Sequence, residues 1–449
     1  MKLNRRIHAS LIFTALACAG AHAQSPTKQD VPPLSKLAKQ LIELLSQGKY
    51  GELASHFDET VKAALPESKL TAVWAQLTSS VGAFVGVEGV REFNEGGYDV
   101  VVLSCKFSRT SMEAKFSFDK QHRVTGLFFQ PPQLKSEYKP PAYVKRDAFS
   151  ELEVEVGQGE WVLPGTLAVP RGAGPFPGVV LVHGSGPNDR DETIGPNKPF
   201  RDLAWGLASR NIAVLRYEKR TRTYSTKIAR AKGIFTVKEE TVDDALAAME
   251  LLRKSARIDG KRLFVLGHSL GGMLIPRIGK RDSNIVGFFV LAGLTRPLED
   301  TIVEQTTYIF SLDGFISEDE ITQIEEYKRQ ADRVKDPNLS ADTPSEDLPL
   351  NIAPAYWLDL RGYKPHEQAK ELRRPMLILQ GGRDYQVTMV DFDNWKKSLG
   401  GRPNVVLKSY AKLNHLFIEG VGPSTPSEYN IAGHVAAEVI ADIAEWISK

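Results

Sequence analysis

The first third of the chain shows two successive patterns of hydrophobic and polar residues. From Leu34 to Leu45, leucines recur at three- and four-residue intervals, which places them on one face of a helix. A second helical stretch covers 67–79. Apolar and polar residues then alternate, most clearly over 98–107, as they do in half-buried strands. Helices followed by an antiparallel meander predict a small α+β domain over residues 34–132.

A different pattern covers residues 149–449. It begins with two strand-like stretches, 152–156 and 161–169, that form a hairpin. Short, almost continuous apolar runs follow, mostly separated by helical segments. These runs are 179–182, 212–215, 263–266, 286–291, 376–379 and 405–407. Because such runs are typical of parallel strands buried on both faces, we predict an α/β domain with a mostly parallel sheet and helices on both faces.

Two segments interrupt these patterns. Clustered prolines between residues 131 and 141 indicate an extended linker, which we place at 133–148. The apolar runs that end at 291 and begin at 376 are separated by far more chain than one crossover helix requires. We expect an inserted lid over about 295–365, with a charged helix that begins with a capping box of Ser317 and Glu320.

The N-terminus has the three regions of a secretory signal peptide. Lys2, Arg5 and Arg6 precede a short apolar segment, and Ala21-His22-Ala23 forms a small-residue cleavage site. We therefore expect residues 1–23 to be removed, residues 24–33 to form a tether, and the protein to be exported to the periplasm or the extracellular space. The apolar segment is too short for a membrane span.

Charge and cysteine content limit the possible partners. The chain has 57 Lys and Arg against 55 Asp and Glu, and loss of the three basic residues of the signal peptide changes the net charge from +2 to −1. A nearly neutral protein gives no electrostatic reason to expect binding to nucleic acid or to an anionic membrane surface. We expect no membrane span in the mature protein, and no intrachain disulfide, because only Cys105 remains after processing.

Residues 263–272 contain the clearest chemical motif. An apolar strand leads into Gly-His-Ser-Leu-Gly, and a helical stretch follows. A serine on such a sharp strand-to-helix turn is exposed above the sheet, and Gly267 and Gly271 are needed where a Cβ would collide. The motif predicts Ser269 as a nucleophile. It also places the amide of Leu270 at a helix N-terminus, where it can stabilise an oxyanion.

Residues 149–449 resemble the α/β-hydrolase superfamily. The resemblance rests on the serine elbow, on the His-Gly loop at 183–184, and on the order of the triad residues along the chain, which is serine, acid, histidine. The closest branches are bacterial esterases of the dienelactone-hydrolase and serine-aminopeptidase-like types. The resemblance implies an α/β-hydrolase fold with a helical lid and a catalytic triad that needs no cofactor. The domain at 34–132 resembles a cystatin-like α+β domain of unknown function that precedes such hydrolases in exported bacterial proteins.

The resemblance assigns the second oxyanion amide to Ser185, the residue after His183-Gly184. Ser185 is not the expected nucleophile, because a histidine stands where the elbow requires a glycine two residues earlier. For His183 we favour a structural role in anchoring this loop.

Asp384 is the predicted acid of the triad. It follows an apolar strand and a Gly-Gly turn, as the acid of this fold does. The alternative role is an aspartate that only caps a turn or a helix. Asp391 and Asp393 are weaker candidates because they fall in the following helical stretch.

His415 is the predicted base. Of the two histidines that follow both the acid and the last strand, we place His434 within the final helical stretch, which leaves His415, just past the strand. An imidazole at this position can take the proton of Ser269 and return it to the leaving group.

Charged residues near the expected edge of the sheet have two possible roles. They could contact substrate, or they could form internal ion pairs that order the loops. These residues are Asn188, Asp189, Arg190, Asp191, Tyr217, Lys219 and Arg220. The sequence shows neither a metal motif nor a phosphate-binding loop, so we predict no metal and no cofactor.

These features together predict a serine carboxylic ester hydrolase that acts on a small-molecule ester through an acyl-serine. A peptidase or amidase with the same triad remains an alternative, since the same base can protonate an amine. An exported binding protein with a vestigial triad is a third. Substrate choice depends on the lid, whose aromatic residues could line a pocket or, as we favour, form a lid core. These aromatic residues are Tyr308, Phe310, Phe315, Tyr356 and Trp357.

Overall fold

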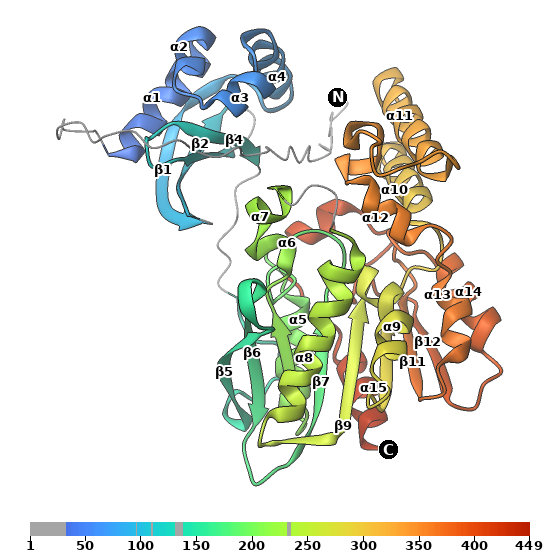
Figure 1. Cartoon of the computed structure of the whole chain (residues 1–449). Coiled ribbons are helices and arrows are strands. Elements are labelled where there is room, and N and C mark those ends of the chain that lie inside the picture. Colours follow the sequence, from blue (N-terminus) through green and yellow to red (C-terminus); the bar gives the residue numbers. More distant parts are fainter. Residues whose placement is uncertain (1–32, 96, 109–110, 131–137, 231–234) are drawn as a thin grey trace. The chain divides into compact units, whose positions relative to one another are not determined.

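The computed structural model describes residues 33–95, 97–108, 111–130, 138–230 and 235–449. The predicted signal peptide, nearly all of the tether and the first part of the linker lie outside these residues. The chain divides into two compact units, residues 1–134 and 135–449, which are described separately below (Figure 1).

The first unit places four helices before an antiparallel meander. The helices are α1 (Leu34–Ser46), α2 (Tyr50–Ser55), α3 (Glu59–Ala64) and α4 (Glu67–Val81). The strands are β1 (Phe84–Glu95), β2 (Tyr98–Phe107), β3 (Ser111–Phe118) and β4 (Val124–Gln130), which pair in sequence order. The predicted α+β arrangement is confirmed, and the two short helices α2 and α3 were not predicted.

One face of β2 forms the core of this unit. Val101, Leu103, Cys105 and Phe107 are buried against the apolar face of α1, as their alternation predicts. Burial raises the pKa of the Cys105 thiol to about 11. Because the thiolate is the reactive form, this cysteine is a packing residue.

The second unit contains eight strands and the remaining helices. The strands are β5 (Phe149–Val156), β6 (Leu163–Pro170), β7 (Phe176–Val182), β8 (Ala213–Tyr217), β9 (Ile258–His268), β10 (Gly287–Leu291), β11 (Met376–Gly381) and β12 (Val405–Tyr410). The helices are α5 (Pro199–Ala208), α6 (Arg220–Thr223), α7 (Ser225–Arg230), α8 (Asp243–Lys254), α9 (Leu270–Arg281), α10 (Leu298–Ser311), α11 (Glu318–Lys335), α12 (Pro354–Leu360), α13 (Pro365–Gln368), α14 (Met389–Leu399) and α15 (Ala437–Ser448), with a π-helical turn η3 (Lys238–Val242) before α8.

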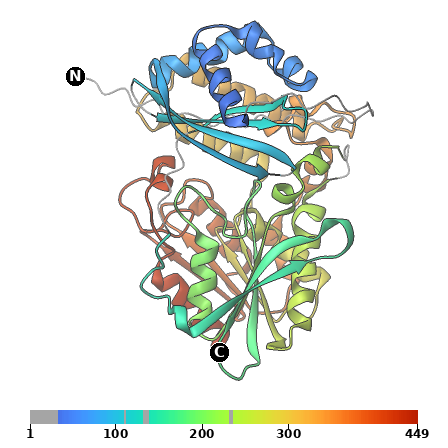
Figure 2. The same ribbon diagram turned by 90° about the vertical axis from the view of Figure 1, so that its left-hand side faces the viewer.

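The eight strands form one sheet in the order β12-β11-β10-β9-β7-β8-β6-β5. The strands from β12 to β8 are parallel, and the hairpin β5–β6 continues the sheet antiparallel to β8. This hairpin lies at the edge that faces the viewer in Figure 2. The predicted α/β fold with a mostly parallel sheet is confirmed, and its parallel strands direct their carboxyl ends to one side.

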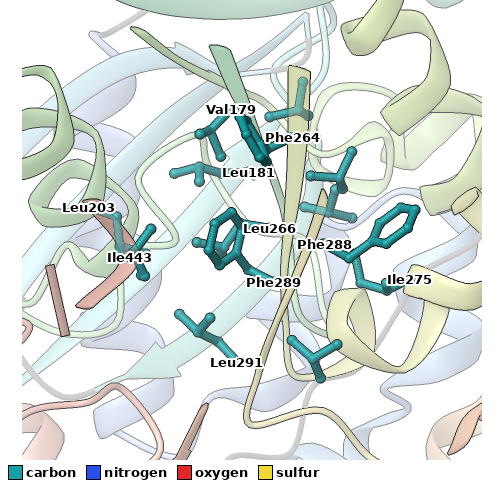
Figure 3. Packing of buried hydrophobic residues seen from close by; sticks show 14 of the residues in the cluster. Val179, Leu181, Leu203, Phe264, Leu266, Ile275, Phe288, Phe289, Leu291 and Ile443 are labelled. Carbon is teal, nitrogen blue, oxygen red and sulfur yellow. The ribbon is translucent and has the colours of Figure 1, made fainter. Parts of the chain in front are cut away.

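Helices cover both faces of this sheet. Phe288 and Phe289 are neighbours in β10 and point to opposite faces, with Phe288 beside Ile275 of α9 (Figure 3). Phe289 packs against Trp446 of α15, with their rings 4.8 Å apart. The inner strands β7, β8, β10 and β11 are therefore buried on both sides, which is why they appear in the sequence as apolar runs, whereas the edge strands β5 and β12 are partly exposed.

The inserted segment between β10 and β11 is helical. In Figure 1, α10, α11 and α12 lie beyond the carboxyl end of β9. The predicted capping box at the start of α11 is confirmed, because Ser317 and Glu320 each accept the other's backbone N–H. Trp357 is buried in a small lid core, whereas Phe315 is 71% exposed. In the described part of the chain, no helix is both long and apolar enough to cross a membrane.

Candidate active site

Ser269 lies on a strained turn between β9 and α9. Its backbone has φ 53° and ψ −117°, in the region that favours glycine. The Ser269 N–H donates to the carbonyl of Leu291 at the end of β10 (2.9 Å), which fixes the turn against the sheet. The residue is 7% exposed. The structure thus gives Ser269 the backbone of a nucleophile elbow.

Two glycines allow this turn to close. A Cβ on Gly267 would lie 2.3 Å from the carbonyl oxygen of Gly271, and a Cβ on Gly271 would lie 2.3 Å from that of Val182. Both collisions are with backbone, so the neighbours could not move aside. The predicted need for glycine at these two positions is confirmed, and the contact with Val182 places the end of β7 directly beside the elbow.

The two predicted oxyanion residues lie in segments that adjoin Ser269. Leu270 is the first residue of α9, and an amide at this position has no acceptor within its helix. Ser185 follows Gly184 in the loop after β7, and a Cβ on Gly184 would lie 3.2 Å from the Cβ of Ser269. The loop that carries the Ser185 amide therefore reaches the serine side chain.

Asp384 uses its two oxygens for two purposes. Its Oδ1 accepts the backbone N–H groups of Gln386 (2.8 Å) and Val387 (2.9 Å). Its Oδ2 accepts from the Gln380 side-chain amide (3.1 Å) and lies 2.7 Å from Nδ1 of His415. The turn-capping role and the contact with the predicted base, which the sequence presents as alternatives, therefore occur together in one carboxylate.

His415 lies in the loop after β12 and is 4% exposed. Because a carboxylate can only accept, the contact with Asp384 assigns the proton to Nδ1 and leaves Nε2 as the other ring nitrogen. The carbonyl of His415 lies 3.0 Å from Nε2 of His268, and the two imidazole rings are 4.6 Å apart. The backbone of the predicted base is thus attached to the residue that precedes Ser269.

A buried ion pair that the sequence analysis missed connects these parts. Nδ1 of His268 lies 2.8 Å from Oε2 of Glu192, and Oε1 of Glu192 accepts the N–H of Gly184 (2.6 Å). Burial lowers the pKa of His268, but the charge and hydrogen bond of Glu192, the carbonyl of His415 and the charge of Asp384 together outweigh burial, and the pKa is raised. Burial likewise raises the pKa of Glu192, and His268, His183 and the Gly184 N–H together leave it lowered. Glu192 therefore ties the oxyanion loop to the elbow.

The charged residues of the neighbouring loops mostly pair with one another. Arg190 contacts Glu153 and Glu218, and Asp191 contacts Arg216 and Arg201. Two further residues make hydrogen bonds: Asp189 accepts from Thr193, and Asn188 donates to the carbonyl of Ser185. Two more form ion pairs, Lys219 with Glu240 and Arg220 with Asp244. Of the two roles considered from the sequence, internal ordering of the loops is the one that these contacts support.

One expectation about the histidines was wrong. His434 does not lie in the final helix, because α15 begins at Ala437. A β-bridge between Ile418 and Val435 keeps this segment extended, and Nδ1 of His434 lies 3.1 Å from Asp202. His183, by contrast, is buried between the rings of Phe200 and Tyr217, as an anchoring residue would be.

The burial of His183 predicts an acid-sensitive contribution to stability. Burial lowers its pKa to about 4, whereas in the unfolded chain the pKa is the ordinary value of about 6.5. At pH values between these two, His183 is therefore neutral in the folded protein and protonated in the unfolded chain. Stability is then lost as the pH falls, by about 3 kcal/mol in total. We expect His183→Asn to show a correspondingly smaller loss of unfolding free energy between pH 7 and pH 4 in urea titrations. Equal losses in both proteins would contradict this assignment.

The lid contacts the loop that carries the acid. Tyr308 of α10 stacks on Tyr385 with ring centroids 5.1 Å apart, and the side-chain amide of Gln305 donates to the carbonyl of Gln386 (2.8 Å). Both partners lie within two residues of Asp384. The first lid helix is therefore seated on the acid loop, next to the predicted triad.

Within the described ranges, no three His, Cys, Asp or Glu side chains gather as metal ligands. The arrangement that is present consists of a serine on an elbow, a carboxylate bound to an imidazole, and two backbone amides beside the serine. Such a set can activate a hydroxyl for attack on an acyl carbon and stabilise the resulting oxyanion.

Comparisons with known proteins identify the family of the chain. Residues 179–429 match the model of the alpha/beta hydrolase family, and residues 38–127 match a protein family of unknown function (DUF3887). Esterase EstD of Thermotoga maritima is 41% identical over 410 residues, which cover 91% of this chain and 94% of the esterase.

More distant similarities are found among solved structures. An esterase of Pyrococcus furiosus is 15% identical with a TM-score of 0.43, over 71% of this chain and 96% of its own. Est1E from Butyrivibrio proteoclasticus is 14% identical with a TM-score of 0.43, over 66% of this chain and 99% of its own. From the family match and the 41% identical relative, the chain is a hydrolase that belongs to the alpha/beta hydrolase family.

Proposed function

We propose that the protein is a serine carboxylic ester hydrolase that forms an acyl-serine on Ser269, with Asp384 as the acid and His415 as the base. The observation that carries the proposal is the 2.7 Å contact between Asp384 and His415, in a loop attached to the residue next to the elbow serine. The buried carboxylate orients the imidazole and stabilises its cation.

The proposed reaction has two halves. His415 takes the hydroxyl proton as the Ser269 oxygen attacks the ester carbonyl, and the amides of Leu270 and Ser185 stabilise the tetrahedral oxyanion. Collapse of this intermediate breaks the bond to the alkoxy group, which leaves as an alcohol with the proton from His415. Water, deprotonated by His415, then attacks the acyl-serine, and as the bond to the Ser269 oxygen breaks His415 returns the proton to that oxygen, which releases the carboxylic acid and the free serine.

The choice of an ester over an amide rests on the relative. Esterase EstD is similar over almost the whole length of both chains, including the first unit. The triad itself serves both bonds, because the same imidazolium can protonate an alkoxide or an amine. The similarity to an esterase therefore favours esters over amides, two substrate classes that the site alone does not separate.

A substrate panel tests this choice. We expect the purified protein to hydrolyse short p-nitrophenyl esters with a kcat/KM at least roughly 100-fold above that for aminoacyl p-nitroanilides of matched side chain, within the range that enzyme sites can discriminate. Initial rates followed at 405 nm give both values. Efficient cleavage of the anilides with feeble ester turnover would identify a peptidase instead.

A further inference from the structure

The peptide unit between Gly184 and Ser185 is held from its carbonyl side by a buried lysine. Nζ of Lys219 donates to the carbonyl of Gly184 at 2.7 Å, and the side-chain amide of Asn188 reaches the same oxygen at 3.3 Å. Lys219 follows the end of β8, and its own N–H donates to the carbonyl of Asn188 (3.1 Å). The lysine is therefore fastened to the oxyanion loop through both its backbone and its side chain.

This contact bears directly on the proposed oxyanion amide. The Gly184 carbonyl and the Ser185 N–H belong to one planar peptide, and in a trans peptide they point in opposite directions. A donor that fixes the carbonyl therefore also fixes the direction of the N–H. A cation at the carbonyl oxygen further polarises the peptide and makes its N–H a stronger donor, since linked hydrogen bonds reinforce one another.

Lys219 is an unusual residue to find at this position. It is 1% exposed, and burial of an ammonium group is costly unless the charge is paired. Its partner is Glu240, 3.0 Å away in the π-helical turn η3. The pair places a positive charge directly at the carbonyl of the Gly184–Ser185 peptide.

The pair is also connected to the lid. Oε2 of Glu240 accepts the hydroxyl of Tyr356, a buried residue of α12, at 2.9 Å. A continuous chain of polar contacts thus runs from the lid through Glu240 and Lys219 to the peptide of Ser185. Lid packing and the direction of the oxyanion amide are held by the same set of side chains.

We propose that Lys219 is a positioning residue that orients and polarises the oxyanion amide of Ser185, and that Glu240 and Tyr356 hold Lys219 in place from the lid. This inference rests on the proposed function and deepens it. Because the oxyanion exists only along the reaction path, loss of Lys219 weakens binding of tetrahedral species and leaves the capture of the neutral ester largely intact.

The test uses the full-length protein and a trifluoromethyl alkyl ketone, which forms a tetrahedral adduct with an active serine. We expect Lys219→Met to lower kcat/KM for p-nitrophenyl butyrate by roughly 10- to 100-fold per active site, titrated with a fluorophosphonate. The inhibition constant of the ketone should rise by the same factor. Tyr356→Phe should shift both quantities together by a smaller factor, roughly two- to tenfold.

Two further variants separate positioning from folding. Lys219→Met with Glu240→Gln removes both charges, so no carboxylate is stranded in the interior, and it should show the same parallel loss if the single variant does not fold. Arg253→Met removes a cation on α8 that pairs with Glu250 and Asp282, away from this chain of contacts, and should leave the inhibition constant unchanged. An equal rise with Arg253→Met would contradict a specific role for Lys219.

The outcomes distinguish the two proposals. An active wild-type protein whose Lys219 variants bind the ketone as tightly as wild type overturns the role of Lys219 and leaves the esterase proposal standing. Unchanged values for Tyr356→Phe overturn the link to the lid. A wild-type protein that neither hydrolyses the ester nor binds the ketone overturns the proposed function itself.

Discussion

A Ser269→Ala variant is expected to lose roughly 10⁴- to 10⁶-fold in kcat on short p-nitrophenyl esters, which is the loss that removal of a triad nucleophile causes. No other hydroxyl occupies the elbow, where φ is 53° and both flanking glycines are required by backbone contacts. The measurement is the steady-state rate at saturating ester, with folding of the variant checked by urea unfolding.

Ser185 provides the matched comparison. A Ser185→Ala variant keeps the backbone amide that the proposed mechanism uses, so its kcat should fall by less than about tenfold. A Ser269→Gly variant should be as inactive as Ser269→Ala. Its free energy of unfolding should be about 1–3 kcal/mol higher than that of Ser269→Ala, because glycine adopts the positive φ without strain. Near-complete loss with Ser185→Ala and wild-type turnover with Ser269→Ala would exchange the roles of the two serines.

An Asp384→Asn variant is expected to lower kcat by roughly 10³- to 10⁴-fold. The amide can keep the two backbone hydrogen bonds that Oδ1 accepts from Gln386 and Val387, so the loop should remain folded. What it loses is an acceptor for Nδ1 of His415, which then adopts the other tautomer or turns away. The loss is therefore one of chemistry and should be seen in kcat at unchanged unfolding free energy.

The control for this change is Asp393→Asn. Asp393 lies in α14, within ten residues of Asp384, and is exposed. Asp393→Asn makes the same chemical change at a nearby, exposed position of the chain and should leave kcat at the wild-type value. A kcat for Asp384→Asn within tenfold of wild type would show that another group orients the imidazole.

Much of the fold could be predicted because most strands of the sheet are recognisable in the sequence as continuous apolar runs. Strands covered on both faces are apolar, and β7, β10, β11 and the second half of β9 are buried throughout, as their apolar runs predict. The run at 405–407 does form a parallel strand, but β12 is the edge strand and is only partly buried, so its predicted burial on both faces was wrong. The elbow was equally accessible, since its glycines flank Ser269 in a short motif and a Cβ on Gly267 would collide with the backbone of Gly271 in the same motif. The signal peptide at 1–23 stays a prediction.

The polar interior could not be predicted in the same way. Glu192 and His268 are 76 positions apart in the sequence, and Lys219 meets Gly184 from the end of another strand. Such pairs have no periodicity, because their geometry arises only when the carboxyl ends of the parallel strands are brought together. The sequence feature that pointed to these pairs was the run of polar and charged residues at 188–191, directly after the His-Gly loop. That feature is equally consistent with substrate contacts and with internal ion pairs.

The lid shows the same limit. Its capping box was predictable because both partners lie three residues apart, whereas the stacking of Tyr308 on Tyr385 joins two elements that are separate in the sequence. His434 was misplaced because its segment is held extended by pairing with Ile418, a long-range contact that overrides the local helical pattern.

The central claim is that Ser269 is the residue that becomes acylated, and the most direct measurement is to locate a covalent adduct. The protein is treated with a fluorophosphonate, digested and sequenced by tandem mass spectrometry. The account predicts one equivalent of adduct on Ser269 and none in protein denatured beforehand, because the hydroxyl is activated only in the folded site. No adduct, or an adduct on Ser185 with Ser269 unmodified, would contradict it.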